Sequence, residues 1–326
     1  MQTRPQIISY AAVVGEKEGS GRLGREFDLV EPDSYFGKDT WEAAESEMLR
    51  RCFEKTCFKA NLAEKDIDIV LSGDLLDQCT SSAFTFRKVN VPYIGLYAAC
   101  STMAESIALA SMLIDGGFGE NICAITGSHF CTAERQYRFP LEYGGQKPPT
   151  AQSTVTGAGG VIVSSKGKGQ GITYVTAGKI TDAGITDSNN MGSAMAPAAL
   201  GTIVQHFKDT GRTPDYYDAI FTGDLGAIGH DILEELLLRE GFDVKGKYHD
   251  CGVMIYDDDG KRERKFGSGC GCCASVLCGH ILPEMKKGRL KKILFAATGA
   301  LLSPTTVQQK ESIPGICHAV AIESEV

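Results

Sequence analysis

Cys100 is the residue of this chain whose setting most suggests chemistry. It follows an apolar approach and two alanines, and it precedes Ser101 and Thr102, which suit the start of a helix. A thiol at a helix start lies in the positive field of unpaired backbone N–H groups, which lowers its pKa and favours the nucleophilic thiolate. The alternative is that Cys100 is a small buried residue at a strand-to-helix turn, and its spacing alone does not decide between the two.

Four further cysteines gather in the last third of the chain, at Cys270, Cys272, Cys273 and Cys278. Their spacing, C-x-C-C-x4-C, differs from the usual zinc-ribbon spacings, and no second C-x2-C pair accompanies it. Twelve cysteines in 326 residues are too few for a disulfide scaffold. We therefore expect free, mostly buried thiols, with neither a resident metal nor a cofactor, although a zinc site is the alternative for this cluster.

The chain contains an internal repeat. Residues 68–75 read DIVLSGDL and residues 218–225 read DAIFTGDL, so each is an apolar run that an acid opens and a Ser/Thr-Gly-Asp-Leu turn closes. Stretches 100–127 and 272–299 then match in the same order, each with a cysteine, a helix ending at glycine and a strand ending in Thr-Gly. Two matches in the same order favour a duplication over a chance similarity.

The repeat predicts a layered α/β architecture built from two duplicated halves, which we place at residues 1–165 and 166–326. Each half reads as a buried strand, a turn, a connection, a helix and a second strand, which is typical of parallel or mixed sheets covered by helices. Additional residues of the second half fall in the polar stretch 241–265. We predict a hairpin there, with Asp259 and Gly260 in or near its turn.

The segment 98–102, Ala-Ala-Cys-Ser-Thr before a helix of small residues, resembles the nucleophile turn of thiolases and ketoacyl-synthase-type condensing enzymes. That resemblance implies a five-layered α-β-α-β-α fold with mixed sheets and two central helices, beginning near Cys100 and Cys272. In the superfamily the second half supplies histidine or asparagine partners for the nucleophile, and here Asp224 and Cys270 occupy those places. This departure predicts a binding protein rather than an enzyme, with an active acyltransferase that uses Cys100 as the alternative.

A second set of motifs narrows the resemblance. Segment 139–152, FPLEYGGQKPPTAQ, together with 127–129, 156–159 and 268–272, resembles the stage V sporulation protein AD family of spore-forming Firmicutes over the whole chain. The family implies a non-catalytic component of the spore SpoVA channel that binds dipicolinic acid, with calcium. It would act in dipicolinate uptake during sporulation and in its release at germination, beside other SpoVA membrane proteins.

A pyridine dicarboxylate needs hydrogen-bond donors such as helix-start N–H groups, cations and hydroxyls. The predicted ligand-binding residues are Cys100, Ser101, Ser128, His129, Lys147, Asp224 and Cys270. Asp224 would repel a dianion unless it is protonated or bridged by calcium. Arg135 and Arg138 lie one helical turn apart and could clamp a carboxylate, although a solvated helical face is the favoured interpretation of that pair.

Charge and hydropathy exclude several other classes of protein. A net charge of −8 without a long basic run argues against nucleic-acid binding. No apolar stretch approaches the roughly 20 residues of a membrane span, and the N-terminus lacks the layout of a signal peptide. We expect a soluble or peripheral protein of the forespore or spore inner membrane. The superfamily resemblance also implies a homodimer, paired through the strand around residues 91–96.

Overall fold

The computed structural model describes residues 2–137, 151–256 and 266–324. Its strands are β1 (Gln6–Gly15), β2 (Leu29–Glu31), β3 (Ile69–Gly73), β4 (Tyr93–Gly95), β5 (Asn121–Ser128), β6 (Ser153–Thr154), β7 (Gly157–Ser164), β8 (Gln170–Thr176), β9 (Ala219–Thr222), β10 (Tyr248–Asp250), β11 (Gly267–Ser268), β12 (Lys292–Ala300) and β13 (Gly315–Ser324). Its helices are α1 (Glu16–Gly19), α2 (Trp41–Ala60), α3 (Thr80–Phe86), α4 (Thr102–Asp115), α5 (Phe130–Arg135), α6 (Met191–Thr210), α7 (Gly226–Arg239), α8 (Cys251–Met254), α9 (Cys270–Val276), α10 (Leu282–Lys286) and α11 (Pro304–Gln308).

The two halves of the chain share one strand topology. The first half has the order β4-β3-β5-β7-β1 and the second has β10-β9-β12-β13-β8, which is the same order of equivalent strands. In both halves the first three strands of that order are parallel and the last two pairings are antiparallel. The mixed sheets of two duplicated halves are therefore confirmed, while the boundary at residue 165 stays a prediction.

The halves meet along a short seam. Strand β1 pairs with β8 through two residue pairs, Gln6 with Gly171 and Ile7 with Gln170. This contact joins all the main strands, with β2 at the side, into one eleven-stranded sheet. Beyond Ile7 the two strands separate, so that helices can enter between the two halves.

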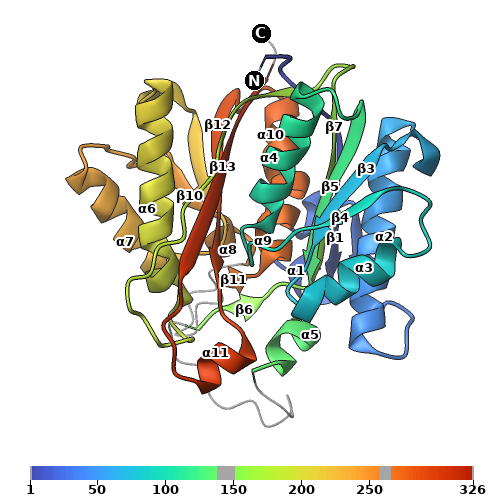
Figure 1. Cartoon of the computed structure of the whole chain (residues 1–326), viewed down its shortest axis with the longest axis horizontal. Coiled ribbons are helices and arrows are strands. Elements are labelled where there is room, and N and C mark those ends of the chain that lie inside the picture. Colours follow the sequence, from blue (N-terminus) through green and yellow to red (C-terminus); the bar gives the residue numbers. More distant parts are fainter. Residues whose placement is uncertain (1, 138–150, 257–265, 325–326) are drawn as a thin grey trace.

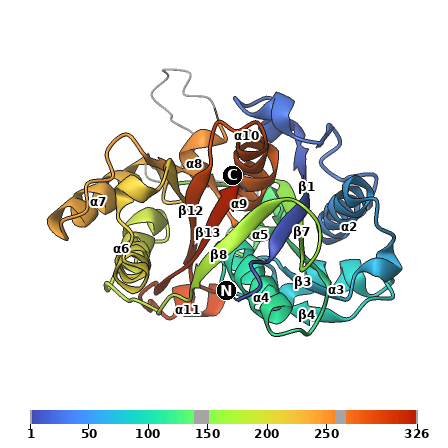
Figure 2. The same cartoon turned by 90° about the horizontal axis from the view of Figure 1, so that it is seen from above.

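Helices occupy three layers around the two halves of the sheet. Helix α4 and the α9–α10 segment, joined by a π-helical turn (Leu277–Ile281), lie between the halves (Figures 1 and 2). Helices α2 and α3 cover the outer face of the first half, and α6 and α7 cover that of the second (Figure 2). Three apolar cores correspond to these contacts, one central and two outer. The α-β-α-β-α arrangement expected from the sequence is confirmed.

Glycines permit the closest approaches near the centre. A Cβ atom on Gly159 of β7 would lie 2.2 Å from the carbonyl oxygen of Ala274 in α9. A Cβ atom on Gly299 of β12 would lie 2.3 Å from the carbonyl oxygen of Ala98, in the turn that carries Cys100. These contacts hold the second half tightly against the start of α4, which fixes the position of that turn.

The prediction of a hairpin in the second half is wrong for the residues that the structure describes. Tyr248–Asp250 forms β10, a three-residue edge strand parallel to β9, and Cys251–Met254 continues as the short helix α8. The side chain of Asp250 caps that helix by accepting from the Val253 N–H. Asp259 and Gly260 lie outside the described residues.

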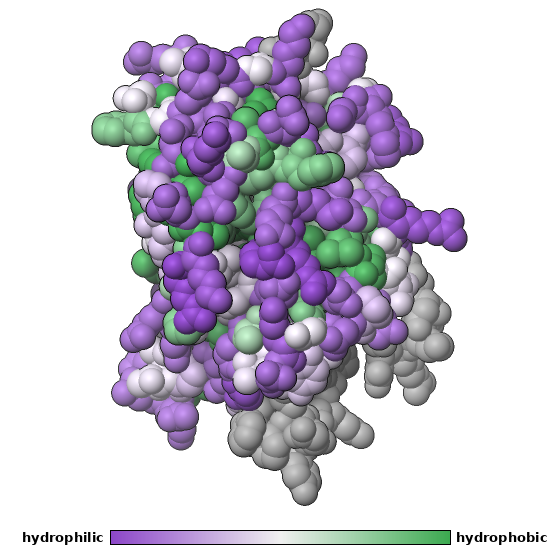
Figure 3. All heavy atoms as spheres, turned by 90° about the vertical axis from the view of Figure 1, so that its right-hand side faces the viewer, coloured by the Kyte–Doolittle hydropathy of each residue, from purple (hydrophilic) through white to green (hydrophobic). Residues whose placement is uncertain are grey.

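Strand β4 forms the opposite edge of the sheet, as the sequence predicted for residues 91–96. Ile94 of this strand and Phe84 of neighbouring α3 are 41% and 52% exposed. Figure 3 shows the side of the molecule that carries α2 and α3, where hydrophobic side chains interrupt a largely polar surface. Across the described ranges, we find no helix with the length and apolar character that a bilayer crossing requires.

Candidate functional site

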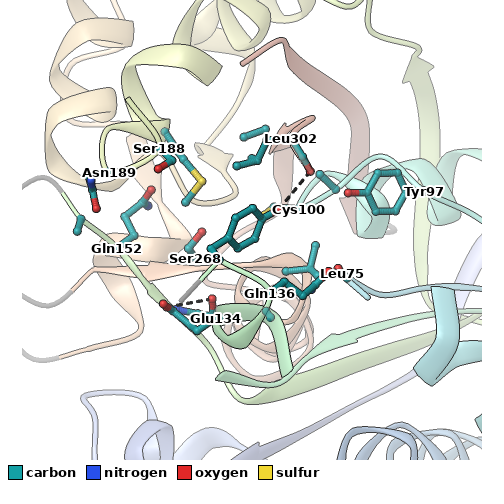
Figure 4. Close-up of a pocket in the computed structure, with 17 residues that line it drawn as sticks. Leu75, Tyr97, Cys100, Glu134, Gln136, Gln152, Ser188, Asn189, Ser268 and Leu302 are labelled. Carbon is teal, nitrogen blue, oxygen red and sulfur yellow. Dashed lines mark hydrogen bonds between the residues drawn. The ribbon is translucent and has the colours of Figure 1, made fainter. Parts of the chain in front are cut away.

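A cavity of about 350 Å³ lies where the two halves meet, at the carboxyl end of β12. Its volume is within the range of small-molecule sites. Figure 4 shows Gln152, Ser188 and Asn189 on one side of it and Leu75 and Tyr97 on the other. The described lining consists of Leu75, Tyr97, Ala99, Cys100, Ala133, Glu134, Gln136, Tyr137, Ala151, Gln152, Thr154, Ser188, Asn189, Met191, Ser268, Ala300 and Leu302.

Cys100 reaches this cavity from a tight turn before α4. Ala99 has a left-handed backbone with φ of 48°, which is uncommon for a residue with a side chain and turns the chain sharply. The Thr102 hydroxyl secures the turn by donating to the Ala99 carbonyl at 2.6 Å and accepting from the Ala98 N–H at 3.1 Å. Helix α4 begins at Thr102, two residues after the cysteine.

Asp224 lies behind Cys100, fully buried in the turn after β9. Its carboxylate accepts hydrogen bonds from the Thr298 hydroxyl at 2.9 Å, the Ser268 hydroxyl at 2.9 Å and the Gly269 N–H at 3.0 Å. Burial raises the pKa of Asp224 to about 6, and the hydrogen bonds from Gly269, Cys100 and Ser268 limit that rise. The repeat thus brings an aspartate of one half against the cysteine of the other.

The electrostatic setting of Cys100 is the reverse of what its sequence position predicts. Burial raises the pKa of the Cys100 thiol well above its ordinary value, and the negative charge of Asp224 raises it further. The predicted lowering of this pKa is therefore wrong, because loss of solvent and a neighbouring carboxylate outweigh the field of the helix start. Cys100 is a neutral thiol that donates a hydrogen bond to Asp224.

We expect the Cys100 thiol of the folded protein to react slowly with alkylating reagents. In the folded protein at neutral pH, iodoacetamide should modify Cys100 at least about tenfold more slowly than in the same chain unfolded in guanidinium, because the rate follows the thiolate fraction. Peptide mass spectrometry over time would measure both rates, with Cys100→Ser identifying the labelled peptide. Equally fast labelling in the folded protein would show that the thiol is activated after all.

Two predicted ligand residues, Ser101 and Ser128, are occupied by backbone partners. The Ser101 hydroxyl donates to the Ala297 carbonyl at 2.6 Å and accepts from the His318 N–H at 3.0 Å. The Ser128 hydroxyl donates to the Val155 carbonyl at 2.8 Å and accepts from the Gly271 N–H at 3.2 Å. Neither serine lines the cavity. Both hydroxyls fasten the central helices to strands instead.

Three further predicted ligand-binding residues are not found in the described lining of the cavity. His129 is buried, donates from Nε2 to the Ser34 carbonyl at 2.8 Å and accepts at Nδ1 from the Cys131 N–H. Cys270 is fully buried and its thiol donates to the Gly127 carbonyl at 3.0 Å. Lys147 lies outside the described residues. Of the seven predicted positions, the structure thus brings Cys100 and Asp224 together.

Several lining residues were missed by the sequence analysis. Gln152 donates to the Asp224 carbonyl at 2.5 Å and to the Gly267 carbonyl at 3.1 Å, so that it ties the two loops together. Glu134 accepts from the Thr154 N–H at 3.2 Å. Gln152 did belong to the distinctive segment 139–152, whereas Glu134 carried no signal because α5 is a single short helix.

Arg135 of α5 does not line this cavity. Arg135 forms an ion pair with Glu42 at the start of α2, and Arg138 lies outside the described residues. Within the part of the chain that the structure describes, the cavity lining contains no lysine, arginine or histidine, and Glu134 is its one carboxylate.

One group of side chains in the described ranges has the geometry of a metal site, and none of its residues lines the cavity. Glu26, His280 and Glu284 bring their ligand atoms within 4.8 Å of one another. His280 already pairs with Glu26 at 2.8 Å, and Glu284 pairs with Lys287 and Arg289. This arrangement is that of a surface ion-pair network.

Comparisons with known proteins agree with this geometry. Structures that share the fold include 3-oxoacyl-[acyl-carrier-protein] synthase III of Aquifex aeolicus, with a TM-score of 0.62, 13% identity and coverage of 98% of this chain and 99% of that one. Cerulenin-bound OleA of Xanthomonas campestris has a TM-score of 0.63 at 13% identity, with 98% of each chain covered. At such identities the likeness shows the fold alone, and it confirms the thiolase-like architecture.

Sequence similarity is far more specific. The stage V sporulation protein AD of Bacillus subtilis (strain 168) is 46% identical over 317 residues, which cover 97% of this chain and 94% of that protein. The sequence profile of stage V sporulation protein AD (SpoVAD) matches residues 1–323. The chain therefore belongs to the stage V sporulation protein AD family.

Proposed function

We propose that this sporulation protein binds dipicolinic acid, free or as its calcium chelate, in the cavity beside Cys100. It would serve as the ligand-binding component of the spore SpoVA channel, in uptake during sporulation and in release at germination. The observation that carries the proposal is the cavity itself, which occupies the nucleophile end of a thiolase-like fold and is bordered by the Cys100 thiol, whose pKa is raised by burial.

The lining of the cavity suits a planar aromatic ligand with polar ends. Tyr97 and Tyr137 contribute aromatic side chains to the lining, and Gln136, Ser188 and Asn189 contribute amide and hydroxyl groups. Few polar groups set among apolar walls are the usual composition of a small-molecule site. A pyridine ring between the tyrosines would leave its carboxylates within reach of such donors.

Charge favours the calcium chelate over the bare dianion. Glu134 is the one carboxylate in the described lining, and the buried carboxylate of Asp224 lies behind Cys100, which is part of that lining. A doubly charged anion would be repelled by these groups, whereas its calcium chelate is neutral overall and presents a cation to Glu134. Carboxylate oxygens are the ligands that calcium prefers.

Titration calorimetry tests this proposal directly. We expect dipicolinate to bind more tightly with calcium than with a chelator present, and Glu134→Gln to reduce that difference by about tenfold, the scale of one charged contact. The same change at exposed Glu240 is the control. If neither heat nor thermal stabilisation appears at millimolar dipicolinate, with or without calcium, the proposed function fails.

We also propose that the site beside Cys100 does not catalyse a reaction, because the groups around the thiol oppose one. Asp224 stands where a condensing enzyme would place a base, and its charge opposes formation of the Cys100 thiolate. The carbanion chemistry of a condensation also needs donors to an oxyanion, which histidine or asparagine supplies in that superfamily. An acyl adduct on Cys100 after incubation with acyl-coenzyme A would favour the acyltransferase instead.

We also propose a homodimer and contacts with membrane-embedded SpoVA proteins. Among the described residues, edge strand β4 has no strand partner on its outer side, and exposed Ile94 and Phe84 lie on or beside it. An apolar sheet edge of this kind is commonly covered by a partner. Light scattering that gave a monomer across a wide concentration range would count against the dimer.

A further inference from the structure

We infer that a basic groove at the opposite end of the molecule binds an acidic segment of a partner protein. The groove has a volume of about 1080 Å³ and lies at the end that carries both chain termini (Figure 1). It is formed by the first residues of β1, β8 and β12 and by the end of α10. The candidate ligand cavity lies at the carboxyl end of β12, so the two sites occupy opposite ends of the fold.

The groove is a consequence of the seam between the halves. Strands β1 and β8 stay paired only at Gln6 and Ile7 and separate beyond them. Tyr10 of β1 and Met285 of α10 line the space that opens between the strands and the central helix. The groove is therefore built by the backbone of both halves and does not depend on a single loop.

The charge of the groove is opposite to that of the whole chain. Its lining, as far as the structure describes it, carries five cations and one carboxylate, although the net charge of the protein is −8; the cations are Arg4, Lys168, Lys286, Lys291 and Lys292. The carboxylate, Glu323, is already bound to Arg212 at 2.7 Å. A second acid, Asp218, accepts the backbone N–H groups of Lys291 and Lys292 rather than their side chains.

Among the described residues, these cations lack acidic side chains paired with them. Within the described part of the chain, none of the five forms an ion pair, and Lys292 lies over the Tyr216 ring at 4.2 Å. By contrast, many surface cations elsewhere are paired, such as Lys59 with Asp28 and Lys166 with Glu120. A concentration of unpaired positive charge attracts and orients an anionic partner.

The walls of the groove are partly apolar. Ile7, Ile8, Tyr10 and Met285 contribute hydrocarbon surface between the lysines. A partner that combines carboxylates with apolar side chains would therefore satisfy both parts of the lining, as an interface with an apolar core and a charged rim does.

The shape of the groove favours a polypeptide over the other anionic partners. Its volume, about 1080 Å³ against 350 Å³ for the cavity, would leave a small anion mostly surrounded by water. A bilayer surface is broad and cannot enter a concave site, so that lipid headgroups would reach its rim alone. A peptide segment can follow the groove and place successive side chains on its walls.

Fluorescence anisotropy tests the inference. The probe is a fluorescein-labelled peptide in which glutamate alternates with leucine. We expect the natural protein to bind it, with binding that weakens as salt screens the charges. The double change Lys286→Glu and Lys291→Glu should weaken binding about tenfold or more. The control, Lys65→Glu with Lys208→Glu, makes the same charge change at exposed positions outside the groove and should have little effect.

Failure of the natural protein to bind the peptide would overturn the inference, and so would equal weakening by the control pair, which would indicate general electrostatic attraction. Co-sedimentation with phosphatidylglycerol vesicles that needs Lys286 and Lys291, without peptide binding, would assign the groove to lipid instead. Lys168→Glu, on the loop between β7 and β8, replaces the double variant if that variant does not fold.

Discussion

Asp224→Asn is expected to gain about 2.4 kcal/mol of stability relative to the natural chain as the pH rises from about 4 to about 7. The folded-state pKa of Asp224 is about 6, against 3.8 for an ordinary aspartate. Between these values the unfolded chain releases the proton and the folded protein keeps it, so that unfolding becomes easier with rising pH. One pKa unit corresponds to about 1.36 kcal/mol, and an asparagine loses this dependence altogether.

At low pH, the Asp224→Asn variant should instead be less stable than the natural chain. Near pH 4 the protonated Asp224 costs little, whereas the asparagine amide opposes the donors Ser268 and Gly269. The variant should therefore begin less stable by about 1–3 kcal/mol and approach or pass the natural chain near neutrality. Urea denaturation across this pH range measures the difference, with Asp39→Asn as the exposed control. A difference that stays constant with pH would contradict a raised pKa at this site.

Comparing the natural chain with a single variant isolates Asp224 from the other buried acids. Burial also raises the pKa of Glu18, Glu45 and Asp74, so each contributes its own loss of stability with rising pH. These contributions are common to both proteins and cancel in the difference, because none of the three groups interacts strongly with Asp224. Asp250 also has a raised pKa and interacts electrostatically with Asp224, so the remaining difference reports Asp224 together with this coupling.

The duplicated architecture could be predicted because it is repeated in local sequence patterns. Each half carries an apolar strand ended by Ser/Thr-Gly-Asp-Leu, and in the structure both aspartates of these turns are fully buried. Asp74 accepts from the N–H groups of Leu76 and Ser82, as its turn requires. Strand β10 could not be predicted in the same way, because three residues gain their strand conformation from pairing with distant β9.

The candidate site depends on contacts between the two halves of the chain, which local sequence patterns do not reveal. The matching of Asp224 to the base position of a condensing enzyme placed it near Cys100 correctly. The acidity of that thiol could not be derived from its place before a helix, because burial and a carboxylate from the other half determine it. Ser101 and Ser128 were likewise chosen for their hydroxyls, and the fold commits these hydroxyls to carbonyls distant in sequence.

Ser188→Trp is expected to weaken dipicolinate binding by at least about a hundredfold, a change of about 2.7 kcal/mol. Ser188 lines the cavity from the loop between β8 and α6, and it is half-buried there (Figure 4). An indole at this position would occupy much of a space of about 350 Å³. The substitution removes no hydrogen bond of the serine side chain within the described residues, so the fold should survive it.

A matched variant separates occlusion from damage to the loop. Thr186→Trp adds the same bulky side chain two residues earlier, at an exposed position that does not line the cavity. We expect this control to bind dipicolinate like the natural protein, and both variants to unfold at nearly its temperature. If Ser188→Trp binds normally in calorimetry while remaining folded, the ligand lies elsewhere. Because the basic groove is at the far end of the fold, its peptide binding should persist in both variants, so that loss of one function does not imply loss of the other.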